Sequence, residues 1–370
     1  MKNWDDWLFR LGLLAIIVNL GWFIWEHRES YKEKFDIAQY ERIYKYSQYN
    51  VPENEFRGNI DDPELFSLAG YKYITGADPS EINFEQQPLA KYFFGISILL
   101  SGNGAIIQLL VGLALLVFTY FLARELVGRT LALLPVLLLS LDPLFREQLY
   151  RVYLDLFLTL NSTIFLLLLW LSLKKEKLRS VTMFWVGIVL LSKSWLFAPM
   201  LGIFLLGFLW FYNKELVADY AKRLIWTGLA YIFGYLVYFF YHSPLDWIIL
   251  HVNQLRLYKS YVPEYPKGEI WRIIFAGEWR KWFGDFGLAK VDTWSIVWPI
   301  ATVGLLVAIY YAVKSSNKMA LLLVFWSLIW LLTISSRLVF PRYLLPALPP
   351  LFILLVYSTQ HILQRKNDIA

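Results

Sequence analysis

The sequence contains no cysteine, and its histidines are few and scattered. Without cysteine the chain can form neither a disulfide nor a thiolate site. The four histidines lack metal-ligand spacing; they are His27, His242, His251 and His361. A glycine-rich phosphate loop, a Gly-x-Ser-x-Gly motif and a His-Glu-x-x-His motif are absent too. A disulfide scaffold is therefore excluded, and the common hydrolase and nucleotide-binding signatures are unmatched.

Charged residues are also scarce, at 17% of the 370 residues, whereas an ordinary soluble domain has about 25%. Hydrophobic residues make up 58% of the chain. One globular core cannot hide so many apolar side chains, because a soluble domain of this size still exposes about a quarter of its chain surface. The composition excludes a soluble enzyme and a disordered chain. In a membrane protein the net charge of +6 reflects orienting Lys and Arg residues, and no nucleic-acid partner is expected.

Apolar runs with few or no charges predict an all-α polytopic membrane protein with about ten transmembrane helices. A helix needs about 20 apolar residues to cross the hydrocarbon, and some of these runs are shorter. The runs cover residues 11–25, 105–122, 130–141, 156–173, 180–192, 195–212, 224–241, 293–313, 319–336 and 343–360. Only Lys193 and Ser194 separate two of them, which predicts a tight hairpin. Because no repeat or linker interrupts the chain, residues 1–370 are expected to form one integral domain with both termini on one side.

Basic residues between the runs predict the orientation. Clusters at 174–179, 222–223, 314–318 and 365–366 belong to the cytoplasmic side by the positive-inside rule. Both termini are then cytoplasmic, and two long segments, 26–90 and 242–292, face the outside of the cell (plasma) membrane. Apolar spacing within these segments predicts a short surface helix over 62–76 and an interfacial helix over 271–283.

Ionisable side chains gather at the outer ends of the predicted spans. They are Asp61, Asp62, Lys91, Arg151, Asp155, Lys193, Arg337 and Arg342. Such residues are costly at a membrane boundary and usually functional. Cations suit a lipid phosphate, and an outward-facing carboxylate can take a proton from a hydroxyl group. Together they predict transfer from a lipid-phosphate donor to a hydroxyl acceptor.

Some of these residues also have a structural interpretation. Asp61 opens an Asp-Asp-Pro-Glu run that could simply start a helix, so cap and catalyst are equally supported. Lys91 and Arg151 could extend toward lipid headgroups. Asp155 and Lys193 fit such an interpretation poorly, because a charge beside an apolar run is costly unless it has a partner.

The motifs around these residues resemble the C superfamily of membrane glycosyltransferases, in the branch of protein O-mannosyltransferases and aminoarabinose (lipid A) transferases. Asp61-Asp62 is similar to the first-loop Asp-Glu pair of that family, with Asp62 in place of Glu. Residues 86–91 resemble a His-Pro-Pro-Leu-x-Lys segment in which two glutamines replace His-Pro. Residues 187–197 resemble a Gly-rich span that ends in a lysine, and 342–349 a late-span Arg/Tyr-Leu-Leu-Pro-x-x-Pro motif. A weaker fifth likeness pairs Asp155 with an arginine that lies four residues ahead instead of five.

The resemblance implies roles for individual residues. Asp61 would be the catalytic base, or a metal ligand as in the lipid A branch, with support from Asp62. The residues expected to hold the polyprenyl phosphate or to shape the site are Lys91, Gln87, Arg151, Asp155, Lys193, Arg337, Arg342 and Tyr343. If a divalent metal ion takes part, Asp61 and Asp155 are its candidate ligands; no other cofactor is expected.

The expected activity is that of an inverting glycosyltransferase surrounded by membrane lipids. It would move a mannose-like monosaccharide from a polyprenyl-phosphate donor to a hydroxyl of a protein Ser/Thr, a glycan or a lipid. The alternative is a lipid-linked sugar flippase or transporter without transferase activity. Transporters commonly carry internal repeats and helices broken at the midplane. This sequence has no repeat, and its charges lie at one face, which favours the enzyme.

Overall fold

The long apolar runs fold as helices, since the bilayer core offers no water to satisfy backbone N–H and C=O groups. The computed structural model describes residues 2–52, 58–261, 267–281 and 287–369. Its first helices are α1 (Lys2–Glu26), α2 (Arg28–Lys32), α3 (Ile37–Lys45), α4 (Asp62–Ile74), α5 (Leu89–Ser101), α6 (Ala105–Val127), α7 (Leu133–Leu141), α8 (Pro143–Tyr150), α9 (Leu154–Lys174) and α10 (Arg179–Ser192). They are followed by α11 (Ala198–Asn213), α12 (Glu215–Lys222), α13 (Leu224–Phe233), α14 (Pro244–Tyr261), α15 (Glu269–Ala276), α16 (Val297–Lys314), α17 (Lys318–Ser335) and α18 (Leu348–Ile369). Short 3₁₀ helices are η1 (Glu176–Leu178), η2 (Trp195–Phe197), η3 (Tyr238–Phe240) and η4 (Pro341–Ala347), and strands are β1 (Glu278–Arg280) and β2 (Leu288–Lys290).

Seven helices in the described residues are long and apolar enough to cross a membrane, which confirms the predicted fold class. They cover Trp4–Glu26, Ala105–Val127, Leu154–Lys174, Trp195–Asn213, Val297–Lys314, Lys318–Ser335 and Pro341–Gln364. The other three predicted spans form shorter helices: α7 with 9 residues, α10 with 14 and α13 with 10. Seven spans therefore agree in position, and the total of ten remains a prediction.

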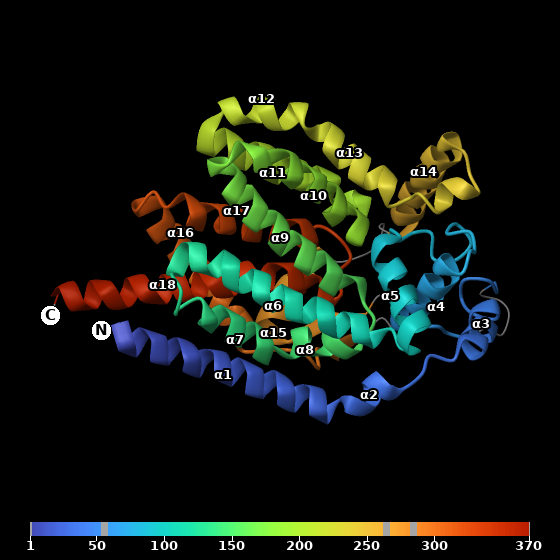
Figure 1. Ribbon diagram of the computed structural model, residues 1–370, viewed down its shortest axis with the longest axis horizontal. Helices are drawn as coiled ribbons and strands as arrows, with labels where there is room; N and C mark the ends of the chain where they lie inside the picture. The colour runs from blue at the N-terminus through green and yellow to red at the C-terminus, as the bar shows by residue number, and fades with distance from the viewer. Residues whose placement is uncertain (1, 53–57, 262–266, 282–286, 370) are drawn as a thin grey trace.

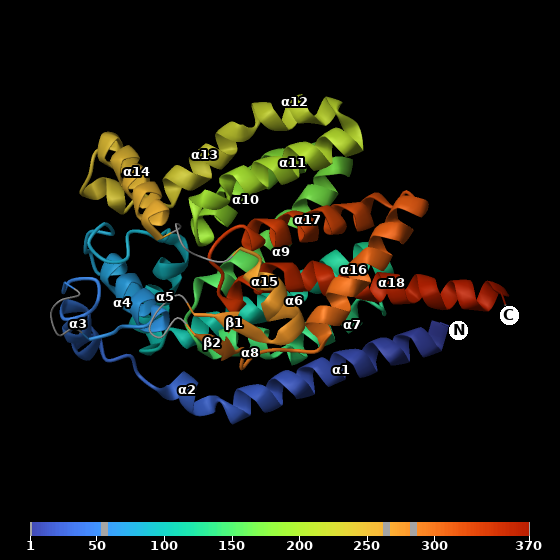
Figure 2. The same ribbon diagram turned by 180° about the vertical axis from the view of Figure 1, so that it is seen from behind.

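The long helices run roughly along one axis of the molecule (Figure 1). Both termini lie at one end of this bundle, and α3, α4 and α14 lie at the opposite end, which we call the distal end (Figures 1 and 2).

The helix predicted over 62–76 is α4, but it is not a surface helix. Seven of its residues are buried, and it packs along its length against α5. Helix α5 was not predicted from the sequence, because its 13 residues are too few for a span.

The α4–α5 contact depends on two glycines. A Cβ atom on Gly70 would lie 2.2 Å from the carbonyl oxygen of Lys91, and one on Gly95 would lie 2.1 Å from the carbonyl oxygen of Gly70. No real Cβ atom tolerates such distances from backbone atoms, so only glycine permits this approach. The contact fixes the helix that begins with Asp62 against the rest of the distal end.

The interfacial helix predicted over 271–283 is wrong in its second half. Helix α15 ends at Ala276, because Gly277 adopts a left-handed conformation with φ of +65°. The chain then forms β1, which pairs antiparallel with β2 and sets Trp279 opposite Ala289. Residues 282 and 283 of the prediction lie outside the described residues.

Residues from the two long segments 26–90 and 242–292 pack against each other at the distal end. The hydroxyl of Tyr241 donates to the carbonyl oxygen of Gly76, and Nε2 of His242 lies 2.6 Å from a carboxylate oxygen of Asp78. Further on, the hydroxyl of Tyr258 donates to the carbonyl oxygen of Glu85 over 3.1 Å. These bonds join residues 76–85 to the chain from η3 to α14.

We expect Gly70→Ala to separate α4 from α5 and to lower the free energy of unfolding by about 1–3 kcal/mol, as overpacked cores do. The matched control is Gly202→Ala in α11, where a Cβ atom would meet nothing within 4 Å. Thermal unfolding of both purified variants in the same detergent measures the difference. Equal unfolding temperatures for the two variants would contradict the backbone contact.

Candidate active site

The first element of the candidate site is Asp155, in the first turn of α9. Its side chain is 2% exposed, so its charge must be paired to be stable. One carboxylate oxygen forms an ion pair with Nζ of Lys193, and the other lies 3.3 Å from Nε of Arg342. One carboxylate thus joins residues that lie 38 and 187 positions further along the chain.

Lys193 reaches Asp155 from the predicted hairpin. Helix α10 ends at Ser192, and Lys193 leaves the helical conformation with φ of −149° and ψ of −53°. The hydroxyl of Ser194 then accepts a hydrogen bond from the backbone N–H of Leu196 and starts η2. The Lys193 amine lies 3.7 Å from the ring centroid of Tyr343, a distance that gives a cation–π contact.

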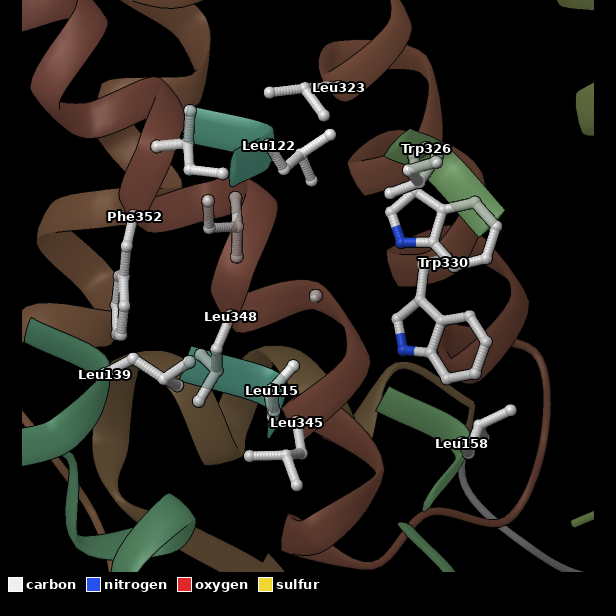
Figure 3. Packing of buried hydrophobic residues seen from close by; sticks show 14 of the residues in the cluster. Leu115, Leu122, Leu139, Leu158, Leu323, Trp326, Trp330, Leu345, Leu348 and Phe352 are labelled. Carbon is white, nitrogen blue, oxygen red and sulfur yellow. The ribbon is translucent and has the colours of Figure 1, made fainter. Parts of the chain in front are cut away.

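Arg342 is positioned by η4, a proline-containing segment that two tryptophans of α17 hold in place. The indole N–H of Trp330 donates to the carbonyl oxygen of Tyr343 over 2.9 Å, and that of Trp326 donates to Pro346 over 3.2 Å. The two indole rings are stacked, with their nitrogen atoms on the same side (Figure 3). Proline has no N–H to donate, so the carbonyl oxygens in this segment lack their usual helical partners. Both tryptophans are buried, and their indole N–H groups satisfy two of these carbonyl oxygens.

Arg342 also connects the bundle to α4. Its guanidinium forms an ion pair with Asp62 and lies over the rings of Tyr153, at 4.7 Å, and Phe340, at 4.2 Å. Asp61, the residue before Asp62, occupies the N-cap position of α4, but its side chain makes no capping hydrogen bond. Its exposed carboxylate accepts a hydrogen bond of 2.8 Å from Asn59. The structural interpretation of Asp61 as a helix cap is therefore not supported, and its carboxylate remains accessible.

Two further carboxylates, which were not predicted from the sequence, interact electrostatically with this group. Glu64 and Glu147 are half-buried, and burial raises the pKa of each above the usual glutamate value. Oε2 of Glu64 is buried without a hydrogen-bond partner. Arg151 lies 3.6 Å from Glu147 and donates to the hydroxyl of Tyr153 over 3.4 Å. The four-residue spacing of Glu147 and Arg151 in the sequence was an available signal for this pair.

Arg337 differs from Arg151, Lys193 and Arg342 because the described part of the chain offers it no carboxylate within ion-pair distance. Its guanidinium lies 5.3 Å from the ring centroid of Phe197 and interacts electrostatically with Tyr343 and Tyr258. Burial lowers the pKa of Arg337, which means that its charge is only partly compensated by the protein. A half-buried cation without a carboxylate partner among the described residues is suited to an anionic ligand.

Two of the predicted residues lie in structural positions. Lys91 is fully buried, and its amine donates to the backbone carbonyl oxygens of Asn83 and Gln86, so it holds the loop before α5. Gln87 is also fully buried, and its backbone N–H donates to the carbonyl oxygen of Lys193. The described residues give Lys91 no contact with Asp155 or Arg342.

The two predicted metal ligands do not form a metal site. Both carboxylate oxygens of Asp155 face cations, and Asp61 bonds to Asn59 instead of approaching Asp155. Among the residues that the structure describes, no group of three or more His, Cys, Asp or Glu side chains is arranged to hold an ion. The donor set of Asp61 and Asp155 therefore does not fit a divalent ion.

Comparison with known proteins supports the resemblance seen in the motifs. The family model of dolichyl-phosphate-mannose-protein mannosyltransferases matches residues 85–247. The fold is similar to that of ArnT from Cupriavidus metallidurans bound to undecaprenyl phosphate, with a TM-score of 0.64 and 13% identity over 97% of this chain and 60% of that one. It is also similar to the Archaeoglobus fulgidus oligosaccharyltransferase tethered with an acceptor peptide, with a TM-score of 0.54 and 14% identity over 99% of this chain and 50% of that one.

No curated protein sequence matches the chain. The chain spans about 60% of the length of the ArnT structure and half of that of the oligosaccharyltransferase. Even so, the likeness extends over nearly all of this chain. The predicted resemblance to C-superfamily membrane glycosyltransferases is confirmed.

We expect Glu64→Gln to stabilise the protein at neutral pH. The pKa of Glu64 is raised in the folded chain. Between the usual glutamate pKa and this raised value, the folded chain therefore binds more protons than the unfolded chain. The free energy of unfolding consequently falls as the pH rises through this range. The neutral amide removes this contribution. Unfolding temperatures measured from pH 5 to pH 8 should therefore decline less for Glu64→Gln than for the unchanged protein or for Glu33→Gln, an exposed control. Parallel curves would disprove the burial effect.

Proposed function

We propose that the chain is an inverting glycosyltransferase that uses a polyprenyl-phosphate monosaccharide. The observation that carries the proposal is the meeting of Asp62, Asp155, Lys193 and Arg342, next to the accessible carboxylate of Asp61. A general base beside fixed cations is the arrangement that such a transfer requires. The family model at residues 85–247 and the undecaprenyl phosphate bound to ArnT support this donor class.

In the proposed reaction, Asp61 accepts the proton of the acceptor hydroxyl as the acceptor oxygen attacks the anomeric carbon. The bond between that carbon and the phosphate oxygen breaks, and the polyprenyl phosphate leaves with the electron pair. Arg337, which lacks a carboxylate partner among the described residues, would bind the phosphate. Lys193 and Arg342 would assist, because all three cations interact with the ring or hydroxyl of Tyr343. Cations at this place stabilise the negative charge that develops on the departing phosphate.

The finer assignments rest on the family model and on charge. The name of that model supports mannose as the sugar and a protein hydroxyl as the acceptor, with a glycan or lipid acceptor as the other choices. Helix α9 runs about 30 Å from Asp155 to the basic cluster that begins at Lys174. The positive-inside rule then puts that cluster and both termini in the cytoplasm, and the site on the outer face of the plasma membrane.

We expect Asp61→Asn to lower turnover by about 100- to 10,000-fold, the usual contribution of a general base, while binding of undecaprenyl phosphate is retained. Product formation from polyprenyl-phosphate mannose and a panel of hydroxyl acceptors, followed by mass spectrometry, gives the measurement. Glu81→Gln, an exposed carboxylate outside the site, is the control. Full turnover in Asp61→Asn would refute its role as the base. Donor binding without transfer by the unchanged protein would instead favour a flippase.

We expect Arg337→Gln to weaken binding of undecaprenyl phosphate by about 10- to 100-fold, because a charge-assisted bond to the phosphate is lost. Binding of an acceptor should change less. The matched control is Arg256→Gln, an exposed arginine of α14. Equal affinities of the two variants for undecaprenyl phosphate, measured by titration in detergent, would count against Arg337 as a phosphate ligand.

A further inference from the structure

Helix α14 carries none of the motifs that predicted the site, yet its inner face bears a buried amide. Gln254 is 1% exposed, and both ends of its amide are bonded. Its Nε2 donates to the carbonyl oxygen of Phe84 over 2.6 Å. Its Oε1 accepts from the indole N–H of Trp195 over 2.8 Å and, over 3.4 Å, from the side chain of Gln87.

Two of these partners, Trp195 and Gln87, adjoin Lys193. Trp195 lies two residues after it, and Gln87 donates its backbone N–H to the carbonyl oxygen of Lys193 over 3.3 Å. Lys193 and Ser194 form a turn between α10 and η2, which we call the Lys193 turn. Gln254 bonds directly to Trp195, the residue that follows this turn, and it is linked through Gln87 to the carbonyl group of Lys193. The phenol of Tyr231 accepts a second bond from the Gln87 amide over 3.3 Å, which completes the support.

The Lys193 turn needs such support because it lies outside the regular helices. Its φ and ψ angles belong to neither α10 nor η2, so helix hydrogen bonds do not fix its backbone. The amine at the end of four methylene groups nevertheless meets one oxygen of Asp155 and the ring of Tyr343. A small displacement of the turn would carry the amine away from both, and misplacement by about 1 Å at a reacting group can cost about 100-fold in rate.

We propose that Gln254 is a positioning residue, which fixes the Lys193 turn and so sets where the lysine amine meets the phosphate of the donor. The proposal rests on the function proposed above for Lys193. Through Gln254 the 242–292 segment would help to position a residue of the site, a role that was not predicted from its sequence. Gln254 does not touch the reacting atoms; it acts on Lys193 through Trp195 and Gln87.

Helix α14 has enough other contacts to stay in place without this amide. His251 lies 2.9 Å from the hydroxyl of Tyr231, and Leu250 is buried in a cluster with Leu191 and Tyr235. Gln254→Met keeps the length of the side chain and loses only its hydrogen bonds. The variant is therefore expected to fold, with α14 docked and the Lys193 turn released.

The test is a double-mutant cycle on the purified full-length chain, with undecaprenyl phosphate as the ligand. Gln254→Met should weaken binding by about 5- to 10-fold in the unchanged background, the value of one or two buried hydrogen bonds. In the Lys193→Met background the same substitution should change binding by less than about 2-fold, because it has no amine left to position. Asn253→Met, an exposed amide one position earlier on α14, is the matched control and should leave binding unchanged in both backgrounds.

A second measurement separates this proposal from the function on which it rests. Hydrogen exchange of the backbone amides from Ser192 to Phe197 should be faster in Gln254→Met and in Trp195→Phe, which removes only the indole donor, but not in Asn253→Met. Unchanged exchange, or equal losses of affinity with and without Lys193, would overturn the positioning role. If exchange accelerates as expected but the unchanged protein binds no undecaprenyl phosphate, the positioning of the turn stands and the proposed donor fails.

Discussion

The candidate site depends on one buried carboxylate that two cations share. Asp155 is almost inaccessible to water, and its two oxygens face Lys193 and Arg342. Removal of either cation would leave a buried charge only partly compensated, and such a charge typically costs several kcal/mol. The shared ion pair therefore fixes three parts of the chain relative to one another: the start of α9, the turn between α10 and α11, and the segment η4 before α18. The extension from Arg342 to Asp62 adds α4 to this assembly.

The same arrangement explains why the cations are not equivalent. Lys193 and Arg342 are engaged with carboxylates and with the faces of aromatic rings, so they are rigid and partly neutralised. Arg337 lies near the rings of Phe197, Tyr343 and Tyr258 and has no carboxylate within ion-pair distance among the described residues, so its charge remains available. In the proposed reaction, an incoming phosphate would meet Arg337 together with two cations that are already ordered. In that reaction, such preorganisation would reduce the reorganisation needed when charge develops on the leaving group.

Much of this was predictable from the sequence, and the parts that were not have a physical reason. Charges beside apolar runs indicated Asp155, Lys193 and Arg342, because such charges need partners whatever the fold. Lys91 followed the same pattern, but its amine donates to two backbone carbonyl oxygens. The local sequence does not show whether a buried lysine will bind backbone carbonyls or a phosphate. Helix α5 was missed because it is too short for a span, and the residues after Gly277 form a strand despite their alternating tryptophans. Gln254 was invisible, since its partners are up to 170 positions away.

The bonds between residues 76–85 and the chain from η3 to α14 have a consequence for biosynthesis. Their partners are separated by 164 to 173 positions. At about 5–20 residues per second, a ribosome needs roughly 10–30 s to make the stretch between them. During this interval residues 76–85 have been synthesised, but Tyr241, His242 and Tyr258, to which they bond, have not. The polar backbone of residues 76–85 must then be satisfied by water or by a chaperone until the later segment is delivered, which makes this pairing a late step of assembly in the nascent chain.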